Sequence, residues 1–251
     1  RIVEGPIGEK KVSPRGSIIM LVAFIVGLLI PAAILWIMFQ MDVTIHGRRE
    51  VEDTTSVPVL GEIPLLKKAD ATTLISDQAS NAPIVEAFRI LRYSMGFMQH
   101  STQVLLCTST TPGQGKSFIS RNLAIVMAMA GKKVLLIDAD VRKRNLSQTF
   151  GGKLGLTTFL ADEYSKVEDI IRPAAIAQQV DFIPAGPIPP NPSELLMSKR
   201  FDDLVTQLRN QYDSIIIDTT PMYSVADANI VGRVADTTLF VLRVGMQNRD
   251  F

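Results

Sequence analysis

The sequence predicts an α/β fold, in which a mostly parallel sheet is covered by helices on both faces and is preceded by one transmembrane helix. Two observations predict it. Short apolar runs alternate with helical patterns over the second half of the chain, and strands that are apolar on both sides are typical of parallel sheets enclosed by helices. Before them, residues 16–41 contain no charged side chain.

The uncharged run is long enough to cross a bilayer. A helix over residues 17–39 would measure roughly 35 Å at ~1.5 Å per residue, against a hydrocarbon core of ~30 Å. A signal peptide would have a shorter apolar run followed by a small-residue cleavage site. We therefore expect a transmembrane helix over 17–41, after an extracytoplasmic stub over 1–16. Basic residues flank both ends of the run, so the positive-inside rule does not orient it.

The remaining elements follow in order. Residues 42–81 are expected to form a juxtamembrane linker, which is loop-like over 42–56 and contains a short strand over 57–65. Residues 82–251 are expected to form one domain that is incomplete at its C-terminus, because the chain stops soon after a strand. Within it, helices are predicted over 84–98, 116–130, 193–211 and 226–234, and strands over 103–109, 133–140, 180–186, 212–220 and 236–245.

Composition excludes some classes of function. The net charge of +1 gives no case for nucleic-acid binding. Cys107 is the single cysteine, so no intrachain disulfide can form. Since it lies in an apolar run, we expect it to be a small buried strand residue.

The segment TSTTPGQGKS, residues 108–117, nearly matches a phosphate-binding loop. The pattern G-x-x-x-x-G-K-[ST] ends here in Gly115, Lys116 and Ser117, but Thr110 stands at its first glycine. A glycine-rich turn between a strand and a helix directs backbone N–H groups at phosphate oxygens. The fold is therefore expected to be P-loop NTPase-like, with Lys116 on the β/γ-phosphates and the Ser117 hydroxyl on Mg²⁺. The predicted nucleotide contacts are Thr111, Pro112, Gly113, Gln114, Gly115, Lys116, Ser117 and Phe118.

Acidic residues end two other strands. Asp138 and Asp140 follow one apolar run and Asp218 follows another. Each alone could cap a helix, but an acid after an apolar strand is also the Walker-B arrangement that holds Mg²⁺ directly or through water. Because parallel strands end at one edge of a sheet, these acids and Lys116 predict a site for ATP and Mg²⁺. If the domain binds ATP, it must lie on the cytoplasmic side of the membrane.

The loop at residues 108–117, which lacks the first glycine of the pattern, resembles that of the bacterial protein-tyrosine kinases (BY-kinases) of the polysaccharide co-polymerase group. Their pattern S-x-x-P-G-x-G-K-[ST] matches residues 109–117, so that a Pro-Gly turn replaces the missing glycine. Thr111 stands where the cell-division and plasmid-partition ATPases have a second Lys. Further matches are the E-x-x-R-x-x-R helix of Glu86, Arg89 and Arg92, the PPNPSELL segment at 189–196, and Ser13-Pro14-Arg15 before Gly27. The last motif departs from the family pattern at Arg15, Gly8 and Met38.

The resemblance implies a tyrosine autokinase. It would transfer the γ-phosphoryl group of ATP to tyrosines in the C-terminal tail of a neighbouring subunit. Lys116, Asp138, Asp140 and Asp218 are the implied catalytic residues, with Ser117, Asp140 and Asp218 around Mg²⁺ and Asp138 accepting the tyrosine proton. Which of Asp138 and Asp140 contacts the metal stays open.

The resemblance also implies a setting. The protein would lie in the bacterial inner membrane with a cytoplasmic kinase domain, act on polysaccharide polymerisation and export, and meet a tyrosine phosphatase. Glu86, Arg89 and Arg92 would join subunits into a homo-oligomeric ring, although their spacing equally fits an ion pair within one helix. Residues 142–144, Arg-Lys-Arg, are either a solvated loop or face phosphates or a partner. Rival functions are a structural polysaccharide co-polymerase switched by ATP, and a membrane-positioning ATPase.

Overall fold

The computed structural model describes residues 16–41, 44–66, 82–98, 102–151 and 153–246. The chain divides into two compact units, Arg1–Thr44 with Asn248–Phe251, and Ile45–Gln247. Most of the predicted stub and part of the predicted linker lie outside the described residues.

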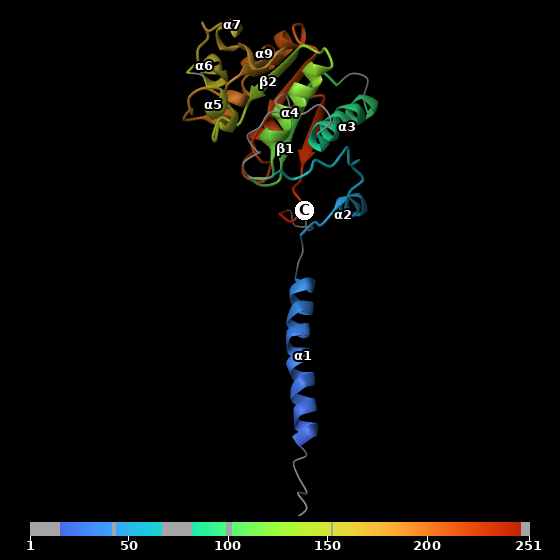
Figure 1. Cartoon of the computed structure of the whole chain (residues 1–251). Helices are drawn as coiled ribbons and strands as arrows, with labels where there is room; N and C mark the ends of the chain where they lie inside the picture. The colour runs from blue at the N-terminus through green and yellow to red at the C-terminus, as the bar shows by residue number, and fades with distance from the viewer. Residues whose placement is uncertain (1–15, 42–43, 67–81, 99–101, 152, 247–251) are drawn as a thin grey trace, which may run out of the picture. The chain divides into compact units, whose positions relative to one another are not determined.

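In the first unit, helix α1 (Gly16–Gln40; Figure 1) is the predicted transmembrane helix. It has 25 residues, an 18-residue window of mean hydropathy 3.0, and exposed side chains throughout. At ~1.5 Å per residue it is roughly 37 Å long, enough to cross a bilayer. It is the single helix among the described residues with the length and composition of a membrane span.

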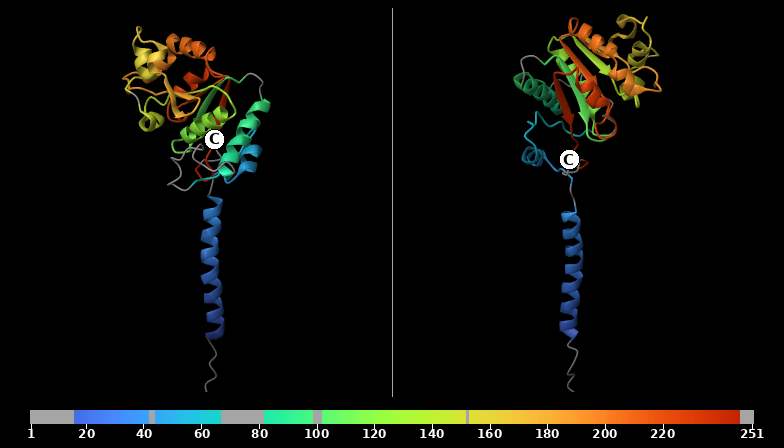
Figure 2. Two further views of the ribbon diagram at one scale, coloured as in Figure 1. Left: turned by 45° about the horizontal axis from the view of Figure 1, so that its top comes forward. Right: turned by 180° about the vertical axis from the view of Figure 1, so that it is seen from behind.

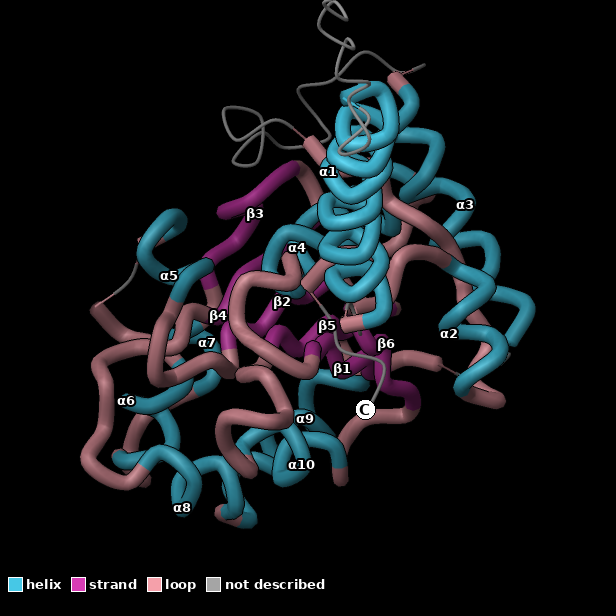
Figure 3. Tube along the Cα trace, turned by 90° about the horizontal axis from the view of Figure 1, so that it is seen from below, coloured by secondary structure: helices cyan, strands magenta, loops and turns pink. Residues whose placement is uncertain are grey.

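The second unit is built on a six-stranded sheet in the order β3-β4-β2-β5-β1-β6 (Figure 3). Strand β3 is antiparallel to β4, and every other neighbouring pair is parallel. The strands are β1 (Val104–Ser109), β2 (Val134–Asp138), β3 (Arg172–Ala177), β4 (Val180–Ile183), β5 (Ser214–Asp218) and β6 (Thr237–Val241). The central strands β1, β2 and β5 are buried throughout, because their residues are apolar on both sides.

Helices cover both faces of this sheet, which confirms the predicted fold class (Figure 2). One apolar core lies under α3 and α4 and includes Phe88 and Leu123. The other lies under α6, α8 and α9 and includes Phe201 and Leu204. The helices of this unit are α2 (Arg48–Thr54), α3 (Pro83–Met98), α4 (Lys116–Met129), α5 (Asn145–Phe150), α6 (Leu156–Ala161), α7 (Val167–Ile170), α8 (Pro192–Met197), α9 (Lys199–Arg209) and α10 (Asp227–Gly232).

Strand register brings the acidic residues together. In the β2–β5 pair, Asp138 lies opposite Asp218, and in the β1–β5 pair, Cys107 lies opposite Asp218. The P-loop begins directly after β1, so it opens at the same edge as both carboxylates. Cys107 is fully buried in β1, as predicted.

Four local predictions were wrong or incomplete. The strand predicted over 57–65 is an irregular extended segment, because its prolines lack the N–H groups that a ladder needs. Part of the predicted loop over 42–56 forms the short helix α2. The helix predicted over 193–211 is broken at Ser198, whose extended backbone separates α8 from α9. Strand β3 was not predicted at all, since its Arg-Pro-Ala-Ala-Ile-Ala sequence has no clear alternation.

Candidate active site

The P-loop closes without its first glycine because a side chain braces it. Gly113 and Gly115 have φ of 89° and 97°, left-handed values that glycine adopts without steric cost. The N–H and hydroxyl of Thr110 lie 3.2 and 2.9 Å from the side-chain oxygen of Gln114, to which both donate. Thr110, at the missing glycine, is therefore a partner of Gln114 within the loop. The sequence named Gln114 as a nucleotide contact, but this bracing role was not foreseen.

Lys116, the first residue of α4, lies between two carboxylates. Its Nζ is 3.3 Å from Oδ2 of Asp140 and 3.7 Å from Oδ2 of Asp218. The Lys116 side chain is 9% exposed, and those of Asp140 and Asp218 are 1% and 0% exposed. Burial opposes the charge on Lys116, but Asp218 and then Asp140 outweigh it, so the pKa of Lys116 is raised and the ammonium persists.

Two hydroxyls of α4 hold Asp218. Ser117 Oγ donates to Oδ2 of Asp218 at 2.6 Å, and Ser120 Oγ lies 3.0 Å from its Oδ1. Burial raises the pKa of Asp218, although Lys116 and these hydroxyls act in the opposite direction. The sequence reasoning missed Ser120, although it lies one helical turn after Ser117 and that spacing could have indicated it.

Asp138 is held by a different set of donors. The backbone N–H and the hydroxyl of Ser147, in α5, donate to its Oδ2 at 2.9 and 2.5 Å, and the N–H of Asp140 donates to its Oδ1 at 3.2 Å. Burial, followed by repulsion from Asp218, raises the pKa of Asp138 to about 7 despite the bonds from Ser147. A carboxylate with a pKa near neutrality suits general-base work. No sequence pattern indicated Ser147, which lies in an element that was not predicted.

Asp140 begins a tight turn after β2. Its Oδ1 accepts the N–H of Lys143 at 3.0 Å, and its carbonyl oxygen accepts the N–H of Arg144 at 2.8 Å. These bonds leave Oδ2 facing Lys116. The turn thus fixes the side of the carboxylate that is presented to the P-loop.

The oxygen atoms at this edge of the sheet are suitable ligands for Mg²⁺. Mg²⁺ prefers oxygen ligands, and proteins usually bind it through one or two carboxylates together with substrate phosphates. Ser117, Asp140 and Asp218 supply a hydroxyl and two carboxylates. In the described part of the chain, no three His, Cys, Asp or Glu side chains form a metal cluster by themselves. The donor set therefore suits a metal that arrives with a nucleotide rather than a closed protein site.

The other predicted P-loop contacts lie where the sequence placed them, between β1 and the first turn of α4. Pro112 and Gly113 are exposed and Thr111 is partly exposed. The Phe118 ring instead packs edge-on against Phe88 of α3, with ring centres 5.9 Å apart. The side chain of Phe118 thus joins α4 to α3, and its backbone lies in the first turn of α4.

The three residues of the predicted interface lie on α3. Glu86 and Arg89 form an exposed ion pair at 3.3 Å. Arg92 is partly buried, and its Nη1 donates to the carbonyl oxygen of Val126 at 3.1 Å, within the same chain. The structure therefore assigns Arg92 a role in joining α3 to α4, while a role between subunits stays a prediction.

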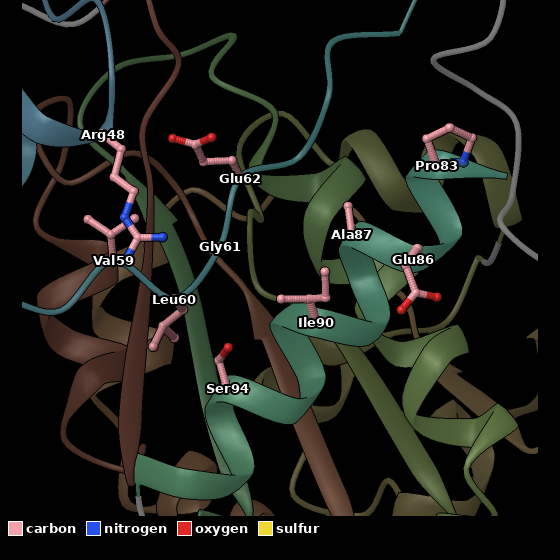
Figure 4. Close-up of a pocket in the computed structure, with 10 residues that line it drawn as sticks. All are labelled: Arg48, Val59, Leu60, Gly61, Glu62, Pro83, Glu86, Ala87, Ile90 and Ser94. Atoms are coloured by element: carbon pink, nitrogen blue, oxygen red, sulfur yellow. The ribbon is translucent and has the colours of Figure 1, made fainter. Parts of the chain in front are cut away.

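A groove of about 540 Å³ runs beside this helix. Figure 4 shows Ala87, Ile90 and Ser94 of α3 along it, with the extended segment 59–62 opposite and Arg48 of α2 at one end. Glu62, Pro83 and Glu86 also line it. None of the P-loop or acidic residues of the candidate active site borders this groove, so it plays no part in the chemistry considered there.

Comparisons with known proteins agree with this geometry. The profile of the AAA domain family matches residues 102–247. The tyrosine-protein kinase Wzc of Salmonella typhimurium is 35% identical over 97% of this chain and 36% of its own length. The tyrosine-protein kinase Etk of Escherichia coli K12 is 34% identical over 98% of this chain and 37% of its own. The chain thus spans about a third of the length of these curated relatives.

Two solved kinase domains are similar over most of their length. The kinase domain of Escherichia coli tyrosine kinase ETK has a TM-score of 0.70 at 34% identity, with 80% of this chain and 84% of that one covered. The BceF tyrosine kinase domain has a TM-score of 0.70 at 38% identity, with 82% and 88% covered. Since the match extends over most of both kinase domains and of this chain, the chain belongs to the family of bacterial tyrosine-protein kinases.

Proposed function

We propose that this chain is the anchoring and catalytic part of a tyrosine autokinase that uses Mg²⁺ and ATP. It transfers the γ-phosphoryl group to tyrosines in the C-terminal tail of a neighbouring subunit. The observation that carries this proposal is the position of Lys116, which lies between the buried carboxylates of Asp140 and Asp218 at the mouth of the P-loop. Relatives named tyrosine-protein kinases support the choice of tyrosine as acceptor.

The residues of the candidate active site have separate roles in this reaction. Backbone N–H groups from Gly113 to Ser117 and the Lys116 ammonium bind and orient phosphate oxygens. Ser117, Asp140 and Asp218 would hold Mg²⁺, which would neutralise charge on the transferring phosphoryl group. Asp138 takes the proton from the tyrosine hydroxyl, since its pKa of about 7 leaves it able to accept one at neutral pH. Phosphoryl transfer needs mostly positioning and charge neutralisation, which this site supplies.

We further propose the cellular setting. Helix α1 anchors the protein in the bacterial inner membrane, and the kinase domain lies in the cytoplasm, where ATP is present. The protein acts in surface polysaccharide polymerisation and export, and a tyrosine phosphatase reverses its phosphorylation. Subunits assemble into a ring through Glu86, Arg89 and Arg92. The kinship with Wzc and Etk, and the apolar length of α1, support this setting.

The kinase reaction can be tested on the chain in detergent, with radiolabelled Mg·ATP and an added Glu-Tyr copolymer as acceptor. We expect label on tyrosine, its loss when EDTA removes Mg²⁺, and its loss in Lys116→Met. The matched control is Lys132→Met, which removes an exposed lysine outside the candidate site. Normal ATP binding without any phosphotyrosine would instead favour a structural co-polymerase that ATP merely switches.

A further inference from the structure

Three polar side chains meet outside the P-loop, in a cluster that the proposed function does not use. Arg142 follows β2, Ser193 lies in the first turn of α8, and Asp227 begins α10. Asp227 Oδ2 accepts Arg142 Nε at 2.7 Å, and its Oδ1 accepts Ser193 Oγ at 2.6 Å and Arg142 Nη2 at 3.3 Å. Arg142 Nη2 also lies 3.1 Å from Ser193 Oγ, so the three residues form a closed ring of contacts.

The carboxylate of this cluster is buried, whereas the guanidinium reaches solvent. The Asp227 side chain is 0% exposed and the Arg142 side chain is 39% exposed. Burial alone would raise the pKa of Asp227, but the bonds from Arg142 and Ser193 outweigh it and lower that pKa. A buried ion pair is a poor source of stability, because well-packed apolar residues often replace it without loss. The bonds from Arg142 to Asp227 and Ser193 do, however, fix the geometry of the guanidinium relative to α8 and α10.

That geometry is transmitted to the candidate active site through a short turn. Arg142 belongs to the turn from Asp140 to Arg144, which is closed by the bond from the Arg144 N–H to the Asp140 carbonyl oxygen. The intervening Val141 is 1% exposed and packs in the core. Asp140 at the start of this turn faces Lys116, while Arg142 in its middle is tied to α8 and α10. The cluster therefore anchors the segment that carries Asp140.

We propose that Asp227 and Ser193 are positioning residues, which fix Arg142 and thereby hold the 140–144 turn so that Asp140 faces the P-loop. This assigns a role to Ser193 of the PPNPSELL segment and to Arg142 of the basic run. It rests on the proposed function only in taking Asp140 as part of the Mg²⁺ and nucleotide site.

Two readouts on the full chain in detergent test the proposal. The first is hydrogen exchange in the nucleotide-free chain, where Asp227→Asn and Ser193→Ala should speed exchange of the Lys143 and Arg144 amides, which are bonded to Asp140. The second is binding of a fluorescent ADP analogue with and without Mg²⁺. Partners bonded directly to a metal ligand typically contribute about 10–100-fold to metal affinity. Because Asp227 acts on Asp140 only through the 140–144 turn, we expect the lower end of that range, so the Mg²⁺-dependent gain in affinity should fall roughly tenfold in Asp227→Asn. Affinity without Mg²⁺ should stay unchanged.

Two further variants separate positioning from general stability. Ser193→Thr keeps the hydroxyl and should restore both readouts that Ser193→Ala loses. Arg209→Gln breaks another arginine–aspartate pair, Arg209–Asp236 at 2.7 Å, which does not join α8 to α10, and should leave both readouts at wild-type values. If Asp227→Asn fails to fold, the comparison of the milder variant Ser193→Ala with Ser193→Thr in both readouts still tests the proposal.

The results overturn the proposal if Asp227→Asn and Ser193→Ala lower only the melting temperature, with exchange at 143–144 and the Mg²⁺ effect unchanged. The cluster would then merely join α8 to α10. A wild-type chain that binds no ADP analogue at all would instead overturn the proposed function. The exchange measurement would in that case still report on whether the cluster holds the turn, because it needs no nucleotide.

Discussion

Two groups of charged residues in the same domain differ in how they are held. At the P-loop, Lys116, Asp140 and Asp218 have side chains that are 9%, 1% and 0% exposed, and each depends on the others. On α3, Glu86 and Arg89 have side chains that are 59% and 36% exposed and form an ion pair at 3.3 Å. Exposed helix pairs contribute about 0.2–0.5 kcal/mol, whereas removing one partner of a buried pair costs about 3–5 kcal/mol. The charges at the P-loop thus hold one another in place, whereas the Glu86–Arg89 pair keeps exposed surface that is available to a partner subunit.

The largest effect is expected from Lys116→Met. It removes the cation that faces two buried carboxylates and that is proposed to bind the phosphates, so tyrosine phosphorylation with Mg·ATP should fall by roughly 10³-fold or more. Quantitative anti-phosphotyrosine measurement checks it, with Lys132→Met as the matched control. Wild-type phosphorylation in Lys116→Met would remove the P-loop from the chemistry.

The acidic residues come next. Asp138→Asn, Asp140→Asn and Asp218→Asn should each lower the phosphorylation rate by about 10²–10⁴-fold. Circular dichroism should stay native, because Asn keeps the shape of the side chain and Lys116 still faces at least one buried carboxylate in every variant. The exposed Asp203→Asn serves as control. If Asp138→Asn transfers phosphate at the wild-type rate, Asp138 is not the base.

The exposed group should behave in the opposite way. Replacing Glu86, Arg89 and Arg92 together by Ala removes surface charge and one bond to a backbone carbonyl, so the free energy of unfolding should fall by only about 1–2 kcal/mol. Nucleotide binding should be retained, while light scattering should show loss of the oligomer. The control is the double variant Arg233→Ala and Asp202→Ala, an ion pair on other helices whose arginine also donates to backbone carbonyl oxygens, as Arg92 does. An unchanged oligomer in the triple variant would show that the stripe is only a solvated face.

The smallest effect concerns Cys107, which is buried beside the site without taking part in it. Burial, followed by repulsion from Asp218, raises the pKa of its thiol to about 12. The thiol therefore stays protonated and unreactive at pH 8, since the thiolate is the nucleophile. Mass spectrometry after iodoacetamide treatment should find no adduct on the native chain and full reaction after denaturation. Rapid labelling of native protein would contradict this burial.

Much of the fold and of the site could be predicted from the sequence because the signals are local. Continuous apolar strands that end in Asp138 and Asp218 predicted both the parallel sheet and the shared edge. The roles of Gln114, Ser147 and Arg142 could not be predicted, because their partners come from tertiary packing or loop geometry. The strand predicted over 57–65 was wrong for a related reason. Apolar residues interrupted by prolines can pack against a helix without joining a sheet.

A crystal structure of the chain with Mg²⁺ and a non-hydrolysable ATP analogue tests the central claim most directly. We predict that the triphosphate lies in the P-loop, that Lys116 Nζ contacts phosphate oxygens, and that Ser117 Oγ and at least one of Asp140 and Asp218 point at the metal. A nucleotide bound elsewhere, with Lys116 Nζ still between Asp140 and Asp218, would contradict the account.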